Sequence, residues 1–165
     1  MSTTIRVATA ADLPTIRAIY GQSVRETVAT FDTDDPPTTY WQAKLDSAAP
    51  GDHLIAVEHG GSMVGFAFSG PFRPRPAYLR TRETSIYLAD TAVGQGLGRL
   101  TYTHLLDLLR ADGIHTVLAV VAEPNPASCA LHEALGFEVV GTLREVGWKF
   151  GHWVDTRWYQ LILSS

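Results

Sequence analysis

The sequence has almost no cysteine, no long apolar segment and no excess of positive charge. Cys129 is the only cysteine among 165 residues, which excludes an internal disulfide and a cysteine-rich zinc site. No run approaches the roughly 18 consecutive apolar residues of a membrane-spanning helix, and no apolar segment of signal-peptide length follows the first residues. We therefore expect a cytoplasmic protein that neither crosses a membrane nor is secreted.

The charge is mildly acidic and spread along the chain. Thirteen Lys and Arg residues against 17 Asp and Glu residues give a formal net charge of −4. A surface that binds nucleic acid through its phosphates needs many cations on one face, and the sequence has no such cluster. Nucleic acid is therefore not expected as a partner. The six histidines lack metal-ligand spacing such as His-Glu-x-x-His, and no metal is expected.

Apolar periodicity and turn residues predict one α+β domain with a mixed sheet over residues 1–165. Its length suffices for a core without metal or disulfide. In the first half, Thr9 with Asp12 favours a helix start, and Pro36 precedes a second amphipathic stretch. The strands expected there are 5–8, 54–58 and 63–69, the last two joined as a hairpin through Gly60 and Gly61.

The second half reads as a βαβ unit followed by a further helix and two strands. A strand, a helix and a buried strand are expected at 84–88, 97–110 and 116–122, with the two strands parallel. Asn125 as N-cap, Pro126 at the first position and Gly136 at the end favour the next helix. The final strands are expected at 137–142 and 153–163.

A glycine-rich loop, residues 93–99, lies between the predicted strand and helix of the βαβ unit. Its sequence is Val-Gly-Gln-Gly-Leu-Gly-Arg. Glycines let backbone N–H groups turn toward one point, and a helix N-terminus adds partial positive charge, which suits a phosphate or pyrophosphate. On spacing alone, a tight turn that needs glycine only for its dihedral angles explains the loop equally well. The loop is not a phosphate-binding loop of the type Gly-x-x-x-x-Gly-Lys-Ser/Thr, because no Lys follows its last glycine. It also lies in the second half of the chain, whereas a dinucleotide-binding fingerprint normally opens its domain at a first strand.

Together with its flanking strands and the residues from Asn125 to Phe137, this loop resembles the acetyl-CoA-binding half of the GNAT N-acetyltransferase superfamily. Within this superfamily, the phosphinothricin N-acetyltransferases are the group that this sequence resembles most, through the runs 96–98, 100–106, 132–137 and 149–155. The resemblance extends from Phe31 through residues 158–161. It implies the GNAT fold, with a mixed sheet of about seven strands flanked by about four helices.

The activity that the resemblance implies is acetyl transfer from acetyl-CoA to the α-amine of a small amino-acid analogue. Phosphinothricin is the first candidate acceptor, and methionine sulfoximine or sulfone is the second. Another amine or a protein N-terminus is an alternative acceptor, and a non-catalytic acetyl-CoA sensor is an alternative class. Fold alone does not decide among acceptors.

The resemblance also implies which residues bind acetyl-CoA. Backbone groups of the strand would hold the pantetheine arm, the loop would hold the pyrophosphate, and two residues at the next helix would complete the site. One departure is Val93, where the superfamily usually has Arg or Gln, so we expect weaker side-chain support there. The cofactor residues are Ile86, Tyr87, Leu88, Gly94, Gln95, Gly96, Leu97, Gly98, Arg99, Asn125 and Ser128.

Two residues are expected to move protons. An amine is protonated near pH 7, so a base must remove its proton before attack. By resemblance Glu83, placed just before strand 84–88, is that base, directly or through a water. His132 matches the position where many GNAT enzymes have a Tyr that protonates the departing thiolate.

Both catalytic candidates also have a plain structural interpretation. Glu83 would be a solvated carboxylate at a strand edge. His132 would be a surface histidine, because the core face of its helix is expected to carry Ala127, Leu131 and Leu135.

The acceptor is expected to meet the basic loop that follows strand 63–69. Arginine binds carboxylate and phosphinate groups in a bidentate manner, and Arg75 and Arg73 match acceptor-binding positions of related enzymes. A solvated basic loop is the alternative. By resemblance Lys149 and Trp153 complete the pocket or a homodimer contact. The substrate-binding candidates are Phe72, Arg73, Arg75, Tyr78 and Lys149.

Overall fold

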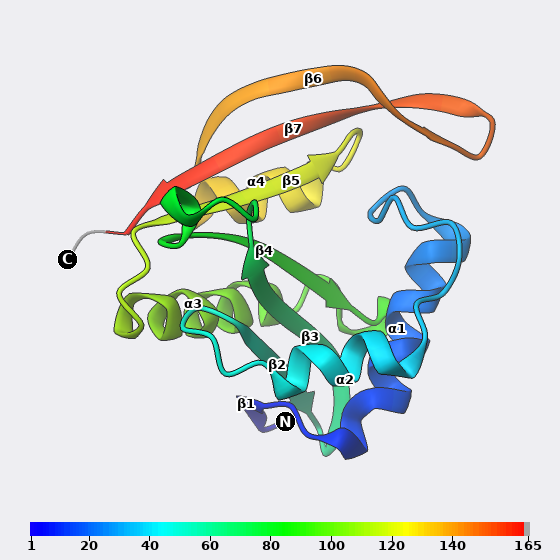
Figure 1. Ribbon diagram of the computed structural model, residues 1–165. Coiled ribbons are helices and arrows are strands. Elements are labelled where there is room, and N and C mark those ends of the chain that lie inside the picture. The colour runs from blue at the N-terminus through cyan, green and yellow to red at the C-terminus, as the bar shows by residue number, and fades with distance from the viewer. Residues whose placement is uncertain (164–165) are drawn as a thin grey trace.

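Seven strands form one sheet in the order β1-β2-β3-β4-β5-β7-β6 (Figure 1). The computed structural model describes residues 1–163, so residues 164 and 165 of the predicted domain lie outside the described part. Every neighbouring pair is antiparallel except β4 and β5, which confirms the mixed sheet. The strands are β1 (Thr3–Val7), β2 (His53–His59), β3 (Ser62–Pro71), β4 (Thr81–Leu88), β5 (Thr116–Ala122), β6 (Glu138–Lys149) and β7 (His152–Ile162).

The four expected helices are present, and local signals set their ends. Thr9 and Asp12 form a capping box around the short 3₁₀ turn that leads into α1. Asn125 caps α4 by accepting a hydrogen bond from the backbone N–H of Ser128 at 3.1 Å. Among the described residues, no helix is long and apolar enough to span a membrane. The helices are α1 (Leu13–Glu26), α2 (Thr38–Asp46), α3 (Leu97–Ala111) and α4 (Pro126–Ala134).

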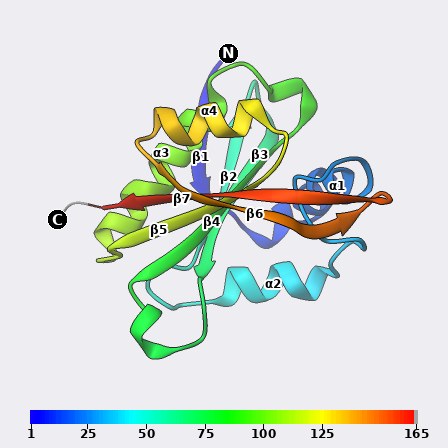
Figure 2. The same ribbon diagram turned by 90° about the horizontal axis from the view of Figure 1, so that it is seen from above.

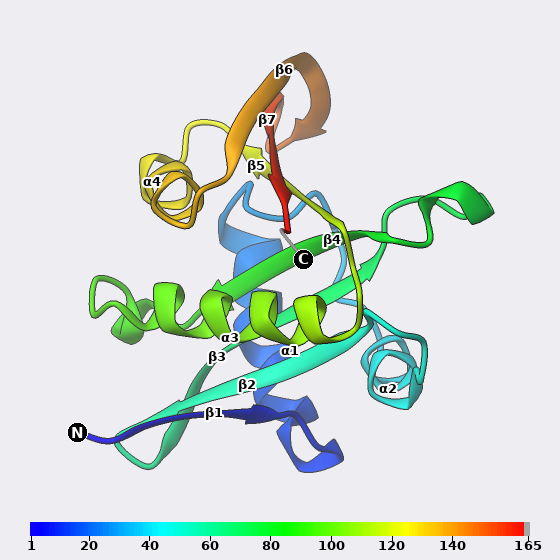
Figure 3. The same cartoon turned by 90° about the vertical axis from the view of Figure 1, so that its left-hand side faces the viewer.

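Helices cover both faces of the sheet, and strand alternation decides which residue faces which helix. In β2, Ile55 packs in the cluster that contains the apolar residues of α3, whereas Leu54 and Ala56 pack in the cluster of α1 and α2. Figure 3 shows α3 across one face with α1 behind the sheet, and Figure 2 shows α4 and α2 on opposite sides. The site described below lies where this sheet is interrupted.

The sheet opens in its middle, between β4 and β5. These parallel strands pair only from Thr81 with Thr116 to Glu83 with Leu118. Beyond Glu83, β4 pairs only with β3 on its other side, and β5 pairs with β7. Successive backbone N–H groups of a strand point to opposite edges, so alternate amides of residues 84–88 face the opening without a strand partner.

The C-terminal hairpin differs from the sequence prediction. The expected break after residue 142 is wrong, because β6 continues through a bulge near Leu143 to Lys149. The strand continues because β7 pairs with it to the end, Trp148 opposite Trp153 and Lys149 opposite His152. Figure 1 shows the tip of this hairpin beside the loop that follows α1. A hydrogen bond joins them: the Lys149 Nζ donates to the carbonyl of Thr30 at 2.8 Å.

Candidate active site

Two cavities adjoin at the opening between β4 and β5. The first, of about 570 Å³, includes the glycine-rich loop and is called the loop cavity. The second, of about 400 Å³, is lined by five tyrosine or phenylalanine residues and is called the aromatic cavity. Both are lined by the same five residues at their common wall: Ala29, Ser85, Tyr87, Val120 and Ala122.

The loop cavity is lined by nine of the eleven residues predicted to bind acetyl-CoA. The two exceptions are Gln95 and Leu97. The Gln95 side chain donates to the Thr91 carbonyl at 2.8 Å and lines a separate groove, and Leu97 is buried in the protein. The side chains of Gln95 and Leu97 therefore do not line the loop cavity, and these two residues could contact the cofactor only through their backbone N–H groups. The nine lining residues are Ile86, Tyr87, Leu88, Gly94, Gly96, Gly98, Arg99, Asn125 and Ser128.

The glycine-rich loop presents an open concave surface at the start of α3. Gly94 and Gly96 have φ angles of +81° and +76°, which a residue with a side chain rarely adopts. Within residues 1–163, and apart from the chain neighbours, no atom lies within 4 Å of a Cβ placed at either residue. Because the loop ends at the N-terminus of the 15-residue α3, its amides and the helix dipole suit a phosphate group. Arg99 is the only Lys or Arg among the lining residues, since Val93 contributes an exposed apolar side chain.

The opening itself fits the extended, amide-containing arm of an acyl thioester of coenzyme A. Residues 84–88 of β4 and 120–122 of β5 line the loop cavity, and they do not pair with each other. An extended chain with amide groups binds such a strand edge by strand-like hydrogen bonds. The residues present therefore fit the cofactor that the sequence predicts.

Glu83 lies inside β4 rather than before it, which corrects the sequence prediction. Its register partners are Gly70 in β3 and Leu118 in β5, so the interpretation as a solvated edge carboxylate is wrong. Glu83 lines the aromatic cavity, and burial raises its pKa above the ordinary value for a glutamate. A carboxylate that binds a proton more readily is better suited to act as a base.

His132 is buried, so its interpretation as a surface histidine is wrong. The predicted core face of α4 is corrected as well, because Ala127 is exposed while His132 packs between the rings of Tyr102, Phe137 and Tyr159. Helix α4 turns this face inward because it packs against the ring of Tyr102 from α3 and that of Tyr159 from β7.

The hydrogen bonds of His132 define its protonation state. A carbonyl only accepts, so Nδ1 donates to the Ser128 carbonyl at 2.7 Å. Burial lowers the pKa of His132, which favours the neutral ring. Nε2 therefore accepts from the Tyr102 hydroxyl at 3.1 Å, and Tyr102 in turn accepts from the hydroxyl of Thr84, which lines the loop cavity. His132 itself also lines this cavity, and Tyr102 links its Nε2 to Thr84.

The aromatic cavity contains charged and aromatic residues that sequence reasoning missed. Tyr20 of α1, Tyr40 and Lys44 of α2, and Asp32 of the intervening loop all line it. Tyr40 and Lys44 are four residues apart, so they share one helix face. That spacing was the only available signal, and it does not distinguish a site from an ordinary surface.

The predicted acceptor-binding residues do not line the aromatic cavity of their own chain. Arg73 and Arg75 are exposed on the loop between β3 and β4, where Phe72 packs against Tyr78. Lys149 is buried and holds the Thr30 carbonyl instead. It therefore positions the loop that carries Thr30, Phe31 and Asp32 into the cavity wall.

Among residues 1–163, no group of three or more His, Cys, Asp or Glu side chains is arranged to hold a metal ion. The two cavities contain the carboxylates, hydroxyls, amides and cations described above.

Comparison with known proteins places this arrangement in a family. Residues 5–158 match the acetyltransferase (GNAT) domain. The chain is 39% identical over 162 residues to a phosphinothricin N-acetyltransferase of Streptomyces coelicolor, covering 94% of each chain. It is 38% identical over 166 residues to an L-methionine sulfoximine/L-methionine sulfone acetyltransferase of Pseudomonas aeruginosa, covering 99% of this chain and 96% of the relative.

A solved structure gives the same result for the fold. The phosphinothricin acetyltransferase of Sinorhizobium meliloti in complex with AcCoA superposes with a TM-score of 0.93 at 36% identity. The match covers 99% of this chain and 89% of that one. The chain belongs to the GNAT superfamily of N-acetyltransferases.

Proposed function

We propose that this protein transfers the acetyl group of acetyl-CoA to the α-amine of a small amino-acid analogue. Phosphinothricin is the first candidate acceptor, and methionine sulfoximine or sulfone is the second. The observation that carries the proposal is the common wall of the two cavities: the loop cavity fits the donor, and Glu83 lines the cavity on the other side. The names of the relatives support the choice of acceptors.

In this mechanism, bound acetyl-CoA supplies the activated acetyl group. The amides at residues 94–99 hold the phosphates, and the unpaired amides of β4 orient the arm and support the negative charge that develops on the acetyl oxygen. Glu83 removes the proton of the acceptor ammonium group, directly or through a water. Enclosing the reaction between β4 and β5 limits the competing reaction with water.

We propose that His132 acts as a positioning residue rather than as the direct proton donor. Its Nδ1 proton is bound to the Ser128 carbonyl, and its Nε2 accepts from Tyr102. The hydroxyl nearest the loop cavity in this chain of groups is that of Thr84. The proton that the departing thiolate takes up is the second one that the acceptor nitrogen releases, and His132 and Tyr102 hold Thr84 in the cavity wall without giving up a proton.

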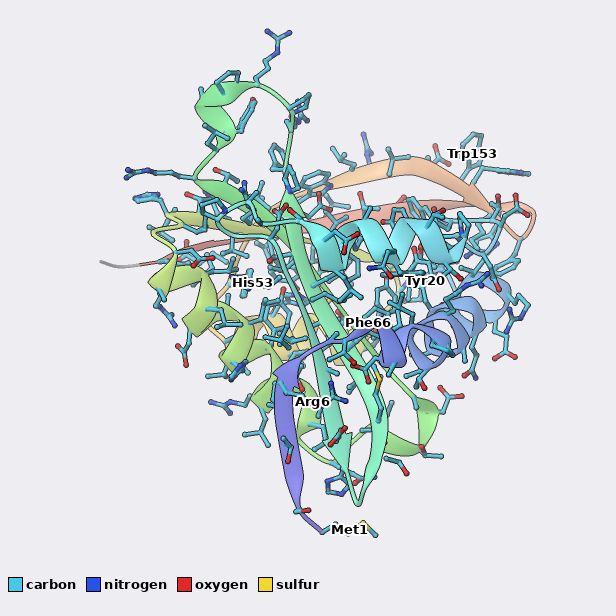
Figure 4. All side chains as sticks on the ribbon, turned by 60° about the horizontal axis from the view of Figure 1, so that its bottom comes forward. Met1, Arg6, Tyr20, His53, Phe66 and Trp153 are labelled. Carbon is cyan, nitrogen blue, oxygen red and sulfur yellow. The ribbon has the colours of Figure 1, made fainter. Side chains whose placement is uncertain are left out.

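A second copy of the chain is the proposed macromolecular partner. Contiguous exposed apolar side chains mark interaction surfaces. The β6–β7 hairpin exposes a set of large apolar residues, and Figure 4 shows Trp153 at its outer side. These residues are Val139, Val140, Leu143, Val146, Trp148, Phe150 and Trp153.

The dimer also gives the predicted arginines a way to act. Phe72, at the start of the basic loop, packs edge-on against Trp158 of β7, so the loop adjoins the hairpin. We propose that a partner's loop brings Arg73 and Arg75 to the acceptor. Light scattering at micromolar concentration checks the dimer: we expect twice the 18.0 kDa of one chain, and a Trp153→Glu variant near 18.0 kDa. A wild-type monomer would refute this part.

The function is tested by incubating the protein with acetyl-CoA and a panel of amines while free thiol is followed. The panel contains phosphinothricin, methionine sulfoximine, methionine sulfone, simple amines and a peptide. We expect thiol release with the amino-acid analogues. Release with the peptide alone would favour a protein N-terminus, and cofactor binding without any release would favour the sensor. We also propose that the protein acts in the cytoplasm and that residues 1–165 form one domain.

A further inference from the structure

Lys44 is an unpaired cation at the wall of the aromatic cavity. Its Nζ lies 4.5 Å from the ring centroid of Phe68 and 4.9 Å from that of Tyr40. Within residues 1–163, no hydrogen bond or salt bridge involves this Nζ. Ring faces attract a cation, but they accept no strong hydrogen bond from it. The ammonium group therefore retains its donors for a ligand.

Partial burial makes this arrangement costly without an anion. Burial lowers the pKa of Lys44, with only the more distant Asp52 acting in the opposite direction. A buried charge normally has a partner of opposite sign. An acidic group of a ligand would supply that partner and would favour the charged form.

The other charges at the cavity wall divide it into two kinds of subsite. Glu83 and Asp32 are its carboxylates, and Lys44 is its only Lys or Arg. Asp32 already accepts a hydrogen bond from Tyr20, whereas the side-chain carboxylate of Glu83 accepts none within residues 1–163. The cavity thus offers one free carboxylate for an ammonium group and one free ammonium for an anion.

We propose that Lys44 binds the α-carboxylate of the acceptor while the acceptor's amine lies toward Glu83. This proposal rests on the proposed function and deepens it, because it makes Lys44 a determinant of specificity for amino acids over simple amines. An amine without a carboxylate leaves Lys44 unpaired in the complex, so the protein binds that amine more weakly. The α-carboxylate is the anion that the candidate acceptors share, whatever their side chain.

The kinetic test uses two variants and two acceptors. Lys44→Met keeps the apolar stem but removes the ammonium group, and Lys44→Arg keeps the charge. The acceptors are methionine sulfone and its carboxamide, which lacks the anion. We expect Lys44→Met to raise the KM for methionine sulfone at least tenfold, with the KM for the carboxamide and for acetyl-CoA changed less than twofold. Lys44→Arg should recover part of the loss.

Two outcomes would overturn the proposal. An equal loss with both acceptors would mean that Lys44 only supports the cavity wall, and an unchanged preference for the carboxylate would mean that another group binds it. Gln42→Met on the same helix is the matched control. Circular dichroism melting confirms that each variant is folded before kinetics are measured.

A binding measurement separates failure of this inference from failure of the proposed function. Lys44 and Lys149 are the only lysines, so reductive methylation with ¹³C-formaldehyde labels two side chains and the N-terminal amine. We expect methionine sulfone, but not its carboxamide, to shift the NMR signal that is missing in Lys44→Arg. If the wild type releases no thiol with any amine, the proposed function fails. The NMR shift then tests by itself whether Lys44 binds the carboxylate. An unshifted Lys44 signal would then refute the proposal.

Discussion

The hydroxyl group of Tyr102 lies 3.1 Å from Nε2 of His132, although the two residues are 30 positions apart and on different helices. Both side chains are buried, and the same hydroxyl is bonded to Thr84 in β4. One phenol therefore joins α3, α4 and the strand that borders the loop cavity.

Replacing Tyr102 with Phe should affect both stability and the chemical step. The ring is kept, but two buried polar groups lose their partner, which should cost about 1–3 kcal/mol of unfolding free energy. If the hydroxyl holds Thr84 in the wall of the loop cavity, kcat should fall while the KM for the acceptor changes little. Urea unfolding and steady-state kinetics measure the two effects. Tyr159→Phe is the control, since its hydroxyl donates to Glu133 and, within residues 1–163, forms no hydrogen bond with Thr84, Tyr102 or His132. Equal kcat in the two variants would contradict a role of Tyr102 in positioning Thr84.

Gly96→Ala should weaken acetyl-CoA binding beyond its effect on folding. The positive φ angle of Gly96 adds strain of roughly 1–2 kcal/mol for a residue with a side chain, and the methyl group enters the open space of the loop cavity. Gly113→Ala is a matched control, because Gly113 has a φ angle of +78° and equally open surroundings at the far end of α3. Calorimetry should give a raised Kd for Gly96→Ala alone. If the Gly96→Ala variant binds acetyl-CoA with the same Kd as the wild type, the loop does not hold the phosphates.

Glu83→Gln should lower kcat/KM by roughly 10²–10⁴-fold, as for the loss of a general base. Because burial raises the pKa of Glu83, the wild-type rate should fall as pH drops through a value above the ordinary glutamate range. The variant should lack that acidic limb and regain activity at high pH, where free amine is abundant. Glu138→Gln, at an exposed position of β6, is the control. A pH profile of Glu83→Gln parallel to that of the wild type, with little loss of rate, would show that Glu83 only positions the acceptor.

Asp12→Asn should destabilise the protein in a pH-dependent manner. The buried Asp12 carboxylate accepts from Arg6 at 2.7 and 2.9 Å and from the Thr9 amide at 2.8 Å. The Arg6 hydrogen bonds, followed by that of Thr9, lower the pKa of Asp12, so its stabilisation is present above the unfolded-state pKa and is lost as pH falls toward the lower folded value.

We expect this substitution to cost about 2 kcal/mol at pH 7 and less at pH 3. Asp107→Asn is the control, because Asp107 forms an exposed pair with Arg110 that contributes little. Urea unfolding at both pH values measures the difference. A cost that does not change with pH would refute the ionic contribution of Asp12.

Local chemistry made much of this fold predictable. A capping box at Thr9, the Asn125-Pro126 helix start and the Gly60-Gly61 hairpin turn each depend on neighbours within a few residues. The glycine-rich loop was identifiable for the same reason, because its φ angles and its place before α3 are local properties. The sequence motifs also identified the family and the cofactor.

By contrast, only the tertiary structure decided how the aromatic cavity is built and that His132 is buried. Lys44 and Tyr20 reach that cavity because α1 and α2 pack on the same face of the sheet as Phe66 and Tyr87. Glu83 became an interior strand residue because β4 pairs with both neighbours at that point. Such contacts join segments many residues apart, and they depend on strand register and helix packing, which local spacing does not encode.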